Sequence, residues 1–315
     1  MKSKTIALSA AATVAALTAA ALINARLARK AERDNPAKGR ILEVDGLRLH
    51  FVERGSGPPL VLLHGNGAMI QDFAASGLLD RAAETHRVIV FDRPGFGHST
   101  RPRRRLWTPA AQADLIHKAL GLIGVEKATV LGHSFGASIA VQLAARHPDM
   151  VQRLVLASGY YFPTFRPGFL GLSVPAIPIL GDIVRYTIAP ALSRMAWPLL
   201  MRMFFGPPRT PAKFSAFPRS MALRPSQLRA AAAETAMLIP HAFAAQEDYA
   251  RITAPVAIIA GDADRVIGFG HSKRLHRLIP DSTLHRVRGG GHMIHQTHTA
   301  ALMAALDAPP ALQSA

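Results

Sequence analysis

The pentapeptide Gly132-His133-Ser134-Phe135-Gly136 constrains the fold of this chain more than any other stretch. The residues before it, 128–131, are apolar and β-branched, which favours a buried strand, whereas residues 136–145 are rich in alanine and lack proline, which favours a helix. A serine between two glycines at such a junction is the pattern of a nucleophile elbow, where the serine backbone is strained and its neighbours tolerate almost no side chain. We therefore predict that Ser134 is a nucleophile at the edge of a sheet.

A nucleophilic serine needs a general base and a group that orients that base. His292 follows three glycines in a loop just past the last predicted strand, and we predict that it is the base. Asp264 follows the apolar run at 256–260 and is the predicted orienting carboxylate, with Asp262 as its competitor. The chain order Ser134, Asp264, His292 is the order found in the α/β-hydrolase arrangement.

A metal site is the alternative use of the histidines near the carboxyl terminus. His295 and His298 follow His292 at positions that could ligate an ion, but no carboxylate lies beside them and the chain has no cysteine. We therefore predict no metal.

The oxyanion of an acyl-transfer reaction needs two preorganised backbone N–H groups. One is expected from Phe135, directly after the nucleophile, and the other from Asn66 in the loop that follows the apolar run at 60–63. His64 is expected to hold that loop by hydrogen bonding. We also predict that a small set of residues beside these donors borders the substrate: His64, Gly65, Gly67 and His133.

Short apolar runs alternate with helical patterns along the chain. The predicted strands cover 41–44, 47–52, 60–63, 88–91, 128–131, 153–157, 256–260 and 283–287. The first two flank Asp45-Gly46, a strong hairpin signal. The others predict an α/β fold with a mostly parallel sheet flanked by helices, whose ligands bind at the carboxyl ends of the strands, where the motifs above lie.

Five motifs together resemble the α/β-hydrolase superfamily, in the branch with a mobile cap. They are His64-Gly65-Asn66-Gly67, Asp92-Arg93-Pro94-Gly95-Phe96-Gly97-His98-Ser99, the elbow, Gly261-x-x-Asp264 and Gly291-His292. The resemblance implies an eight-stranded sheet, a cap after the sixth strand and a triad of Ser134, Asp264 and His292, with a spacing that favours Asp264 over Asp262. Relatives often carry a proline shortly after the acid, whereas this chain has Val266-Ile267-Gly268.

Residues 159–249 interrupt the alternation. They are crowded with prolines and large apolar side chains. Because proline breaks helices and strands, we expect short helical pieces that form an inserted lid. The apolar side chains would form an acyl pocket, a membrane-facing surface or simply the core of the lid itself. The hydrolase core would then comprise residues 41–158 and 250–315.

The amino terminus carries 19 residues without a charge, Thr5 to Ile23, between basic flanks. That length can just cross the hydrocarbon core of a bilayer. We predict a transmembrane anchor over residues 1–25 and a linker over residues 26–40, so that the protein is membrane-anchored. The alternatives are a signal segment cleaved on export, which would leave an exported or periplasmic protein, and a soluble helix. The flanking charges leave the membrane side open.

The chain has no cysteine, which excludes disulfides and cysteine catalysis, and a net charge of +17. Its densest basic cluster, Arg101 and residues 103–105, lies in a proline-flanked loop. This cluster is interpreted as a solvated loop, with lipid headgroups as a second possibility. We predict no nucleic-acid partner because no nucleic-acid-binding motif is present.

These observations predict a serine hydrolase that needs no cofactor and acts on a small apolar acyl ester. Epoxide hydrolases and haloalkane dehalogenases of the superfamily carry aspartate at the elbow, so their chemistry is not expected here. A carbon–carbon bond hydrolase, or a cofactor-free haloperoxidase or perhydrolase, would use the same triad. A membrane-associated binding protein without turnover is the alternative from another class. The physiological substrate and the oligomeric state stay open at this point.

Overall fold

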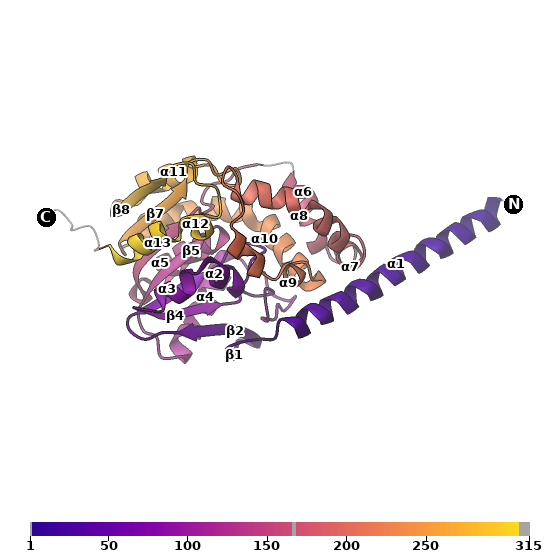
Figure 1. Ribbon diagram of the computed structural model, residues 1–315, viewed down its shortest axis with the longest axis horizontal. Helices are drawn as coiled ribbons and strands as arrows, with labels where there is room; N and C mark the ends of the chain where they lie inside the picture. The colour runs from indigo at the N-terminus through magenta and orange to yellow at the C-terminus, as the bar shows by residue number, and fades with distance from the viewer. Residues whose placement is uncertain (1, 166–167, 309–315) are drawn as a thin grey trace.

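The computed structural model of the protein describes residues 2–165 and 168–308 (Figure 1). Eight strands form one sheet in the order β1-β2-β4-β3-β5-β6-β7-β8. Their bounds are Arg40–Val44 (β1), Leu47–Arg54 (β2), Pro59–Leu63 (β3), Arg87–Phe91 (β4), Ala128–His133 (β5), Val151–Ala157 (β6), Val256–Gly261 (β7) and Ser282–Val287 (β8). Every predicted strand is present, and most are longer by one or two residues at one end.

The sheet is mostly parallel, as predicted. Strands β1 and β2 form the predicted hairpin, and β2 is also antiparallel to β4. All other neighbouring strands run parallel. The carboxyl ends of β3, β5, β7 and β8 therefore meet at one edge, which brings the loops after these strands together.

Helices cover both faces of the sheet and form two cores. One face carries α4 (Pro109–Leu122), α5 (Phe135–Arg146) and α11 (Gly270–Leu278), which contribute Leu115, Ile139 and Leu275 to one buried cluster. The other face carries α2 (Ile70–Ser76), α3 (Leu78–Ala82) and α13 (Thr299–Asp307), whose Phe73 and Leu302 belong to a second cluster. The continuous apolar runs of the parallel strands are explained by this double cover.

The segment between β6 and β7, residues 159–249, is helical and is called the cap segment below. Its α-helices in the described residues are α6 (Gly168–Ser173), α7 (Leu180–Tyr186), α8 (Ala189–Phe205), α9 (Arg219–Ala222) and α10 (Pro225–Ala244). Short 3-10 helices lie between or after them: η2 (Val174–Ala176), η3 (Ala212–Ala216) and η4 (Ala245–Arg251). Contrary to the expectation of short pieces only, α8 has 17 residues and α10 has 20. Pro190 and Pro225 lie in first turns, where no N–H is needed, while Pro198 and Pro240 are accommodated inside the helices.

Helix α1 (Lys2–Asp34) begins the chain, and its amino-terminal part extends away from the rest of the molecule (Figure 1). It continues through residues 26–34, where the sequence suggested a linker, because this stretch is rich in Ala, Arg, Leu and Lys and lacks Gly and Pro. Its carboxyl-terminal part is fixed to the cap segment. The Asn24 side chain donates to the carbonyls of Tyr186 and Thr187 at 2.9 and 3.0 Å, and Glu32 pairs with Arg224 at 2.6 Å.

Among the described residues, α1 is the one continuous helix long and apolar enough to cross a membrane. Its most apolar window has a mean hydropathy of 2.1, and none of that window is buried within the protein. A core helix of a soluble protein would be covered by other elements. The length, composition and exposure of this helix are therefore those of a membrane anchor or of a signal sequence.

Candidate active site

Ser134 lies in a strained turn between β5 and α5, as the elbow pattern predicts. Its backbone has φ 55° and ψ −119°, a region that non-glycine residues rarely adopt. Close packing of the backbone requires a glycine on each side of the turn. A Cβ on Gly136 would overlap the carbonyl of Leu63, and a Cβ on Gly132 would overlap the backbone of Gly136. The turn therefore presents the serine hydroxyl at the carboxyl edge of the sheet.

The structure brings Ser134, His292 and Asp264 together. Nδ1 of His292 lies 2.8 Å from Oδ2 of Asp264, and Nε2 lies 3.0 Å from the Ser134 hydroxyl oxygen. If Nδ1 carries the proton of the neutral ring, Nε2 is free to accept the hydroxyl proton. The side chains of His292 and Asp264 are 5% and 1% exposed, so this chain of hydrogen bonds is shielded from water.

The loop after Asp264 depends on the residues that this chain has where the resemblance suggested a proline. Oδ1 of Asp264 accepts the N–H groups of Val266 at 2.7 Å and Ile267 at 2.8 Å. A proline at either position would lack that N–H. The competing carboxylate, Asp262, instead accepts hydrogen bonds from Arg286 and from the Gly289 N–H, both at 2.7 Å.

The loop after β3 lies against Ser134. A Cβ on Gly65 would come within 3.1 Å of the Ser134 Cβ, so the absence of a side chain there keeps space beside the hydroxyl. In the described part of the chain, the N–H groups of Asn66 and Phe135 donate no hydrogen bond to protein atoms. Both are thus available as oxyanion donors. Gly67, at φ 76°, provides the left-handed turn that ends the loop.

His64 and His133 are buried structural histidines, which corrects the expectation that their side chains border the substrate. His64 is 0% exposed; its Nδ1 donates to the Gly65 carbonyl and its Nε2 accepts the Arg93 N–H. Burial and the nearby Arg93 guanidinium lower the pKa of His64 to about 3. His133 is 2% exposed and donates from Nε2 to the His292 carbonyl at 3.1 Å. Burial and the neighbouring His295 and His292 lower its pKa as well.

Arg93 and Glu234 form a buried ion pair that sequence reasoning did not assign to the site. Both side chains are 0% exposed, and Glu234 lies on α10. Arg93 donates to the carbonyls of His64 at 2.8 Å and Gly65 at 2.9 Å, immediately before Asn66. Its guanidinium also lies 5.2 Å from the centre of the Phe135 ring. Glu234 is the only acidic residue of α10, which is the signal that could have identified the pair.

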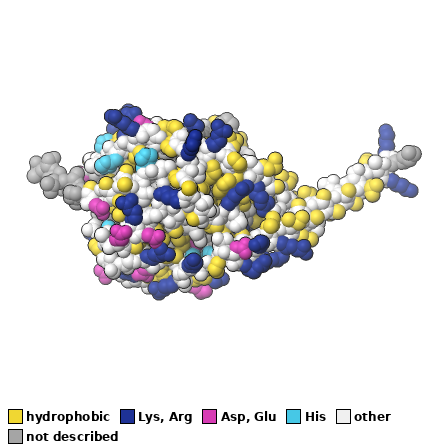
Figure 2. Space-filling view, viewed as in Figure 1, with side chains coloured by type: hydrophobic (Ala, Val, Ile, Leu, Met, Phe, Trp, Pro, Cys, Tyr) yellow, Lys and Arg dark blue, Asp and Glu magenta, His cyan; other side chains and the backbone are white. Residues whose placement is uncertain are grey.

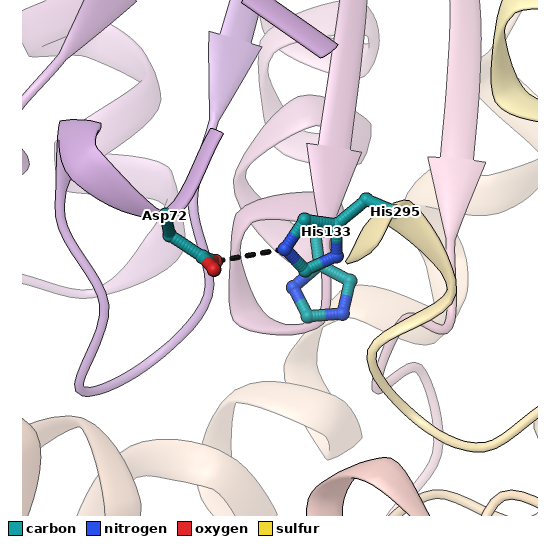
Figure 3. Close-up of side chains that lie close together, drawn as sticks. All are labelled: Asp72, His133 and His295. Carbon is teal, nitrogen blue, oxygen red and sulfur yellow. Dashed lines mark hydrogen bonds and ion pairs between the residues drawn. The ribbon is translucent and has the colours of Figure 1, made fainter. Parts of the chain in front are cut away.

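Asp72, His133 and His295 form a buried cluster with the residue types of a metal site (Figure 3). Their nearest nitrogen and oxygen atoms lie within 4.8 Å of one another. Both carboxylate oxygens are engaged, since His295 Nε2 lies 2.9 Å from Oδ2 and the Gln296 side chain donates to Oδ1 at 2.8 Å. His298 contacts Thr297 instead. We interpret the cluster as a structural hydrogen-bond network that fixes the loop after His292 to α2.

The cap segment touches both halves of the site. The Phe204 carbonyl, near the end of α8, accepts the N–H groups of His292 at 3.0 Å and Met293 at 3.2 Å. On the other side, the Asn66 side chain donates to Ala231 and Thr235 of α10, both at 3.1 Å. His292 and Asn66, the predicted base and one predicted oxyanion donor, are therefore each hydrogen-bonded to a different cap helix.

A family model described as alpha/beta hydrolase fold matches residues 58–299. The chain belongs to the alpha/beta hydrolase fold family. This confirms the resemblance inferred from the five motifs and the predicted fold class.

Several alpha/beta hydrolases are similar to this chain. It is 36% identical over 136 residues to 2-hydroxymuconate semialdehyde hydrolase of Pseudomonas sp. (strain CF600), and the match covers 42% of this chain and 48% of that protein. The chain thus spans about half the length of the curated relatives that it matches first.

Two solved structures share the fold. A membrane phospholipase A described as a bacterial virulence factor is 24% identical with a TM-score of 0.65, over 98% of this chain and 100% of the other. A thermophilic esterase from Thermogutta terrifontis is 19% identical with a TM-score of 0.68; the match covers 85% of this chain and 97% of the esterase. At these identities the likeness shows the alpha/beta hydrolase fold alone.

Proposed function

We propose that the protein is a serine hydrolase that cleaves an ester of an apolar acyl group through an acyl-enzyme on Ser134. The observation that carries the proposal is the hydrogen-bond chain from Ser134 through His292 to Asp264, at 3.0 and 2.8 Å. The strained elbow and the two free N–H groups of Asn66 and Phe135 support it, because acyl transfer needs a nucleophile and oxyanion donors in one place.

In the acylation step, Nε2 of His292 takes the Ser134 proton while the serine oxygen attacks the ester carbonyl. The negative charge that develops on the carbonyl oxygen is stabilised by the N–H groups of Asn66 and Phe135. Asp264 holds the ring orientation and stabilises the imidazolium. When the tetrahedral intermediate collapses, the carbon–oxygen bond to the leaving alcohol breaks and His292 returns the proton to that alcohol.

In the deacylation step, water replaces the alcohol. His292 takes a proton from the water, whose oxygen attacks the acyl carbon, and the carboxylic acid leaves as Ser134 regains its proton. The whole cycle uses groups of this chain and water, so the proposal includes no cofactor.

An apolar acyl group is favoured by the side chains next to the triad. Phe204 of α8 is half-buried and lies 6.2 Å from His292, measured between ring centres; it packs against a buried apolar cluster that includes Phe205, Met69 and Met293. An exposed part of the Phe204 ring beside His292 gains free energy by covering hydrocarbon rather than a charged substrate.

A carbon–carbon bond hydrolase is the second candidate. It is favoured by the 36% identity to 2-hydroxymuconate semialdehyde hydrolase over the segment that both proteins share. The same nucleophile and base would serve, with a carbanion rather than an alcohol as the leaving group.

The decisive experiment treats the full chain in detergent with a fluorophosphonate probe, beside Ser134→Ala. It then measures turnover of p-nitrophenyl esters of increasing chain length and of 2-hydroxymuconate semialdehyde. We expect the probe to label the unmodified protein but not Ser134→Ala, and we expect ester turnover to rise with the length of the acyl chain. Labelling with turnover of the semialdehyde alone would select the second candidate. A folded protein that is not labelled would overturn both and indicate a binding role.

We also propose that α1 anchors the protein in a membrane. The support is the uncharged stretch from Thr5 to Ile23, since none of the most apolar window of α1 is buried in the described part of the protein. Washing isolated membranes with alkaline carbonate tests this: an anchored protein stays in the pellet and keeps residues 1–25 by mass spectrometry. Release of the protein, or loss of those residues, would contradict the anchor, and loss would favour a cleaved signal.

A further inference from the structure

The outer face of the cap segment is strongly apolar. Large hydrophobic side chains on α6, α7, α8 and their connections are exposed to solvent: Leu170, Ile179, Ile183, Leu192, Met195 and Leu199. Ile179 and Met195 are each 78% exposed. Outside α1 and the cap segment, the exposed large hydrophobic residues of the described chain are few and are scattered along the sequence. We call this surface the cap face; Figure 2 shows apolar side chains gathered where the globular part meets α1.

We propose that the cap face is immersed in the same lipid leaflet that α1 enters, so that the protein docks on an anionic bilayer through both. The proposal rests on the anchor proposed above and adds a second, independent membrane contact. Its occupant is a phospholipid surface with net negative charge.

The position of α7 along α1 is the main evidence. A groove between the two helices is lined by Val14, Leu17 and Ala21 of α1 and by Ile183 and Tyr186 of α7. These α1 residues lie well inside the uncharged stretch, and Val14 is about 15 Å further along the helix axis than Asn24, at 1.5 Å per residue. A bilayer that surrounds residues 5–23 therefore reaches the level of α7.

The local structure of the cap face fits this position. Residues Gly168–Ala176 and Leu180–Tyr186 together have the hydropathy of a membrane span, but the chain bends by 95° between them. Each of the two helical pieces is too short to cross a bilayer, so the pair is suited to lie in the membrane–water interface. At the bend, Ile179 has φ 65°, a strained conformation for a β-branched residue, and this conformation accompanies a side chain that points outward.

Charged groups lie where headgroups would be. Arg194 lies 3.4 Å from the Asn24 side chain, at the end of the uncharged stretch, and Arg219 donates to the Arg194 carbonyl and lies 5.4 Å from the centre of the Trp197 ring. Tryptophan and arginine are typical of the membrane interface. The carboxylate in the groove, Asp182, is paired with Arg103 and Arg185 at 2.8 Å. With a net charge of +17, the chain fits an anionic surface.

The absence of cysteine allows a direct test, because one introduced cysteine is the only site of labelling. The full chain is reconstituted into vesicles of phosphatidylcholine and phosphatidylglycerol, with an NBD fluorophore on Leu192→Cys. Leu8→Cys reports on α1. Leu122→Cys, 62% exposed at the end of α4 and hence on the edge of the sheet opposite the cap, is the matched control. Each label is then quenched with brominated lipids.

We expect blue-shifted emission and loss of intensity at positions 8 and 192, and neither at position 122. Quenching at position 8 without quenching at position 192 would overturn the cap-face proposal and leave the anchor intact. Absence of quenching at position 8 would overturn the anchor itself. A blue-shifted label at position 192 that brominated lipids do not quench would mean that protein, such as a second copy, covers the face, which also overturns the proposal.

Discussion

Replacement of Glu234 by glutamine is the sharpest test of how the cap segment supports the site. Glu234 contacts Arg93 with both oxygens, one of them at 3.0 Å, and the two side chains are 0% exposed. Arg93 also donates to Gln112 and to the carbonyls of His64 and Gly65. The substitution keeps the shape of the side chain but removes the charge that compensates the buried guanidinium.

Breaking a buried ion pair from one side costs about 3–5 kcal/mol, because the remaining charge stays desolvated. For a chain of 315 residues, that corresponds to a fall in Tm of roughly 5–8 °C. Because the same guanidinium positions the loop that carries Asn66, kcat should fall too. The fall should be smaller than the roughly 10²–10³-fold loss that follows removal of an oxyanion donor.

The assay is thermal unfolding of the full chain in detergent, followed by circular dichroism, together with ester turnover at a temperature where both proteins are folded. The control is Asp80→Asn, which removes one partner of the exposed pair with Arg54, whose side chains are 49% and 63% exposed. Such pairs contribute at most about 1 kcal/mol. If Glu234→Gln unfolds at the same temperature as the control, the reasoning about the buried pair is wrong.

Three further outcomes are expected. Asp264→Asn should lower kcat by about 10³–10⁴-fold with little change in Tm, since the ring of the base loses its orienting charge; an unchanged kcat would exclude Asp264 from the triad. Gly136→Ala should abolish soluble expression, because its Cβ would overlap the Leu63 carbonyl, whereas Gly121→Ala, with open space around it, should be neutral or slightly stabilising. The free energy of unfolding should fall on acidification below about pH 6.5, by roughly 1.4 kcal/mol per pH unit from His64 alone, because burial and Arg93 lower its folded pKa to about 3 and only the unfolded chain takes up the proton. Urea unfolding between about pH 7 and 5 checks this, and His64→Gln should give a shallower slope.

Local patterns in the sequence sufficed for the sheet and for the position of the elbow. Apolar runs of strand length and the glycines at 132 and 136 each act through neighbours in the chain, so they can be read without coordinates. The same holds for the hairpin at Asp45-Gly46, where both residues have positive φ. The family match confirms the predicted fold class. The roles of the individual site residues stay predictions that the proposed experiments test.

The parts that sequence reasoning missed depend on contacts between distant residues. No local sequence pattern links the two members of a buried ion pair, because the pair forms only once the helices are packed. This holds for Arg93 with Glu234 and for Asp72 with His295. The continuation of α1 through residues 26–34 was missed for a different reason. Charge was read as a sign of a linker, although Arg, Lys and Ala are good helix formers.

The contacts of Phe204 with the backbone at His292, and of α10 with the Asn66 side chain, bear on how such an enzyme can be engineered. A cap that made no hydrogen bonds with these two loops could be excised, or transplanted from a relative, to change selectivity alone. Here the cap segment forms hydrogen bonds with the loops that carry His292 and Asn66. A core without the cap segment would lose these bonds, and both loops would be less well fixed. Any chimaera should therefore preserve these junctions and vary only the residues between them.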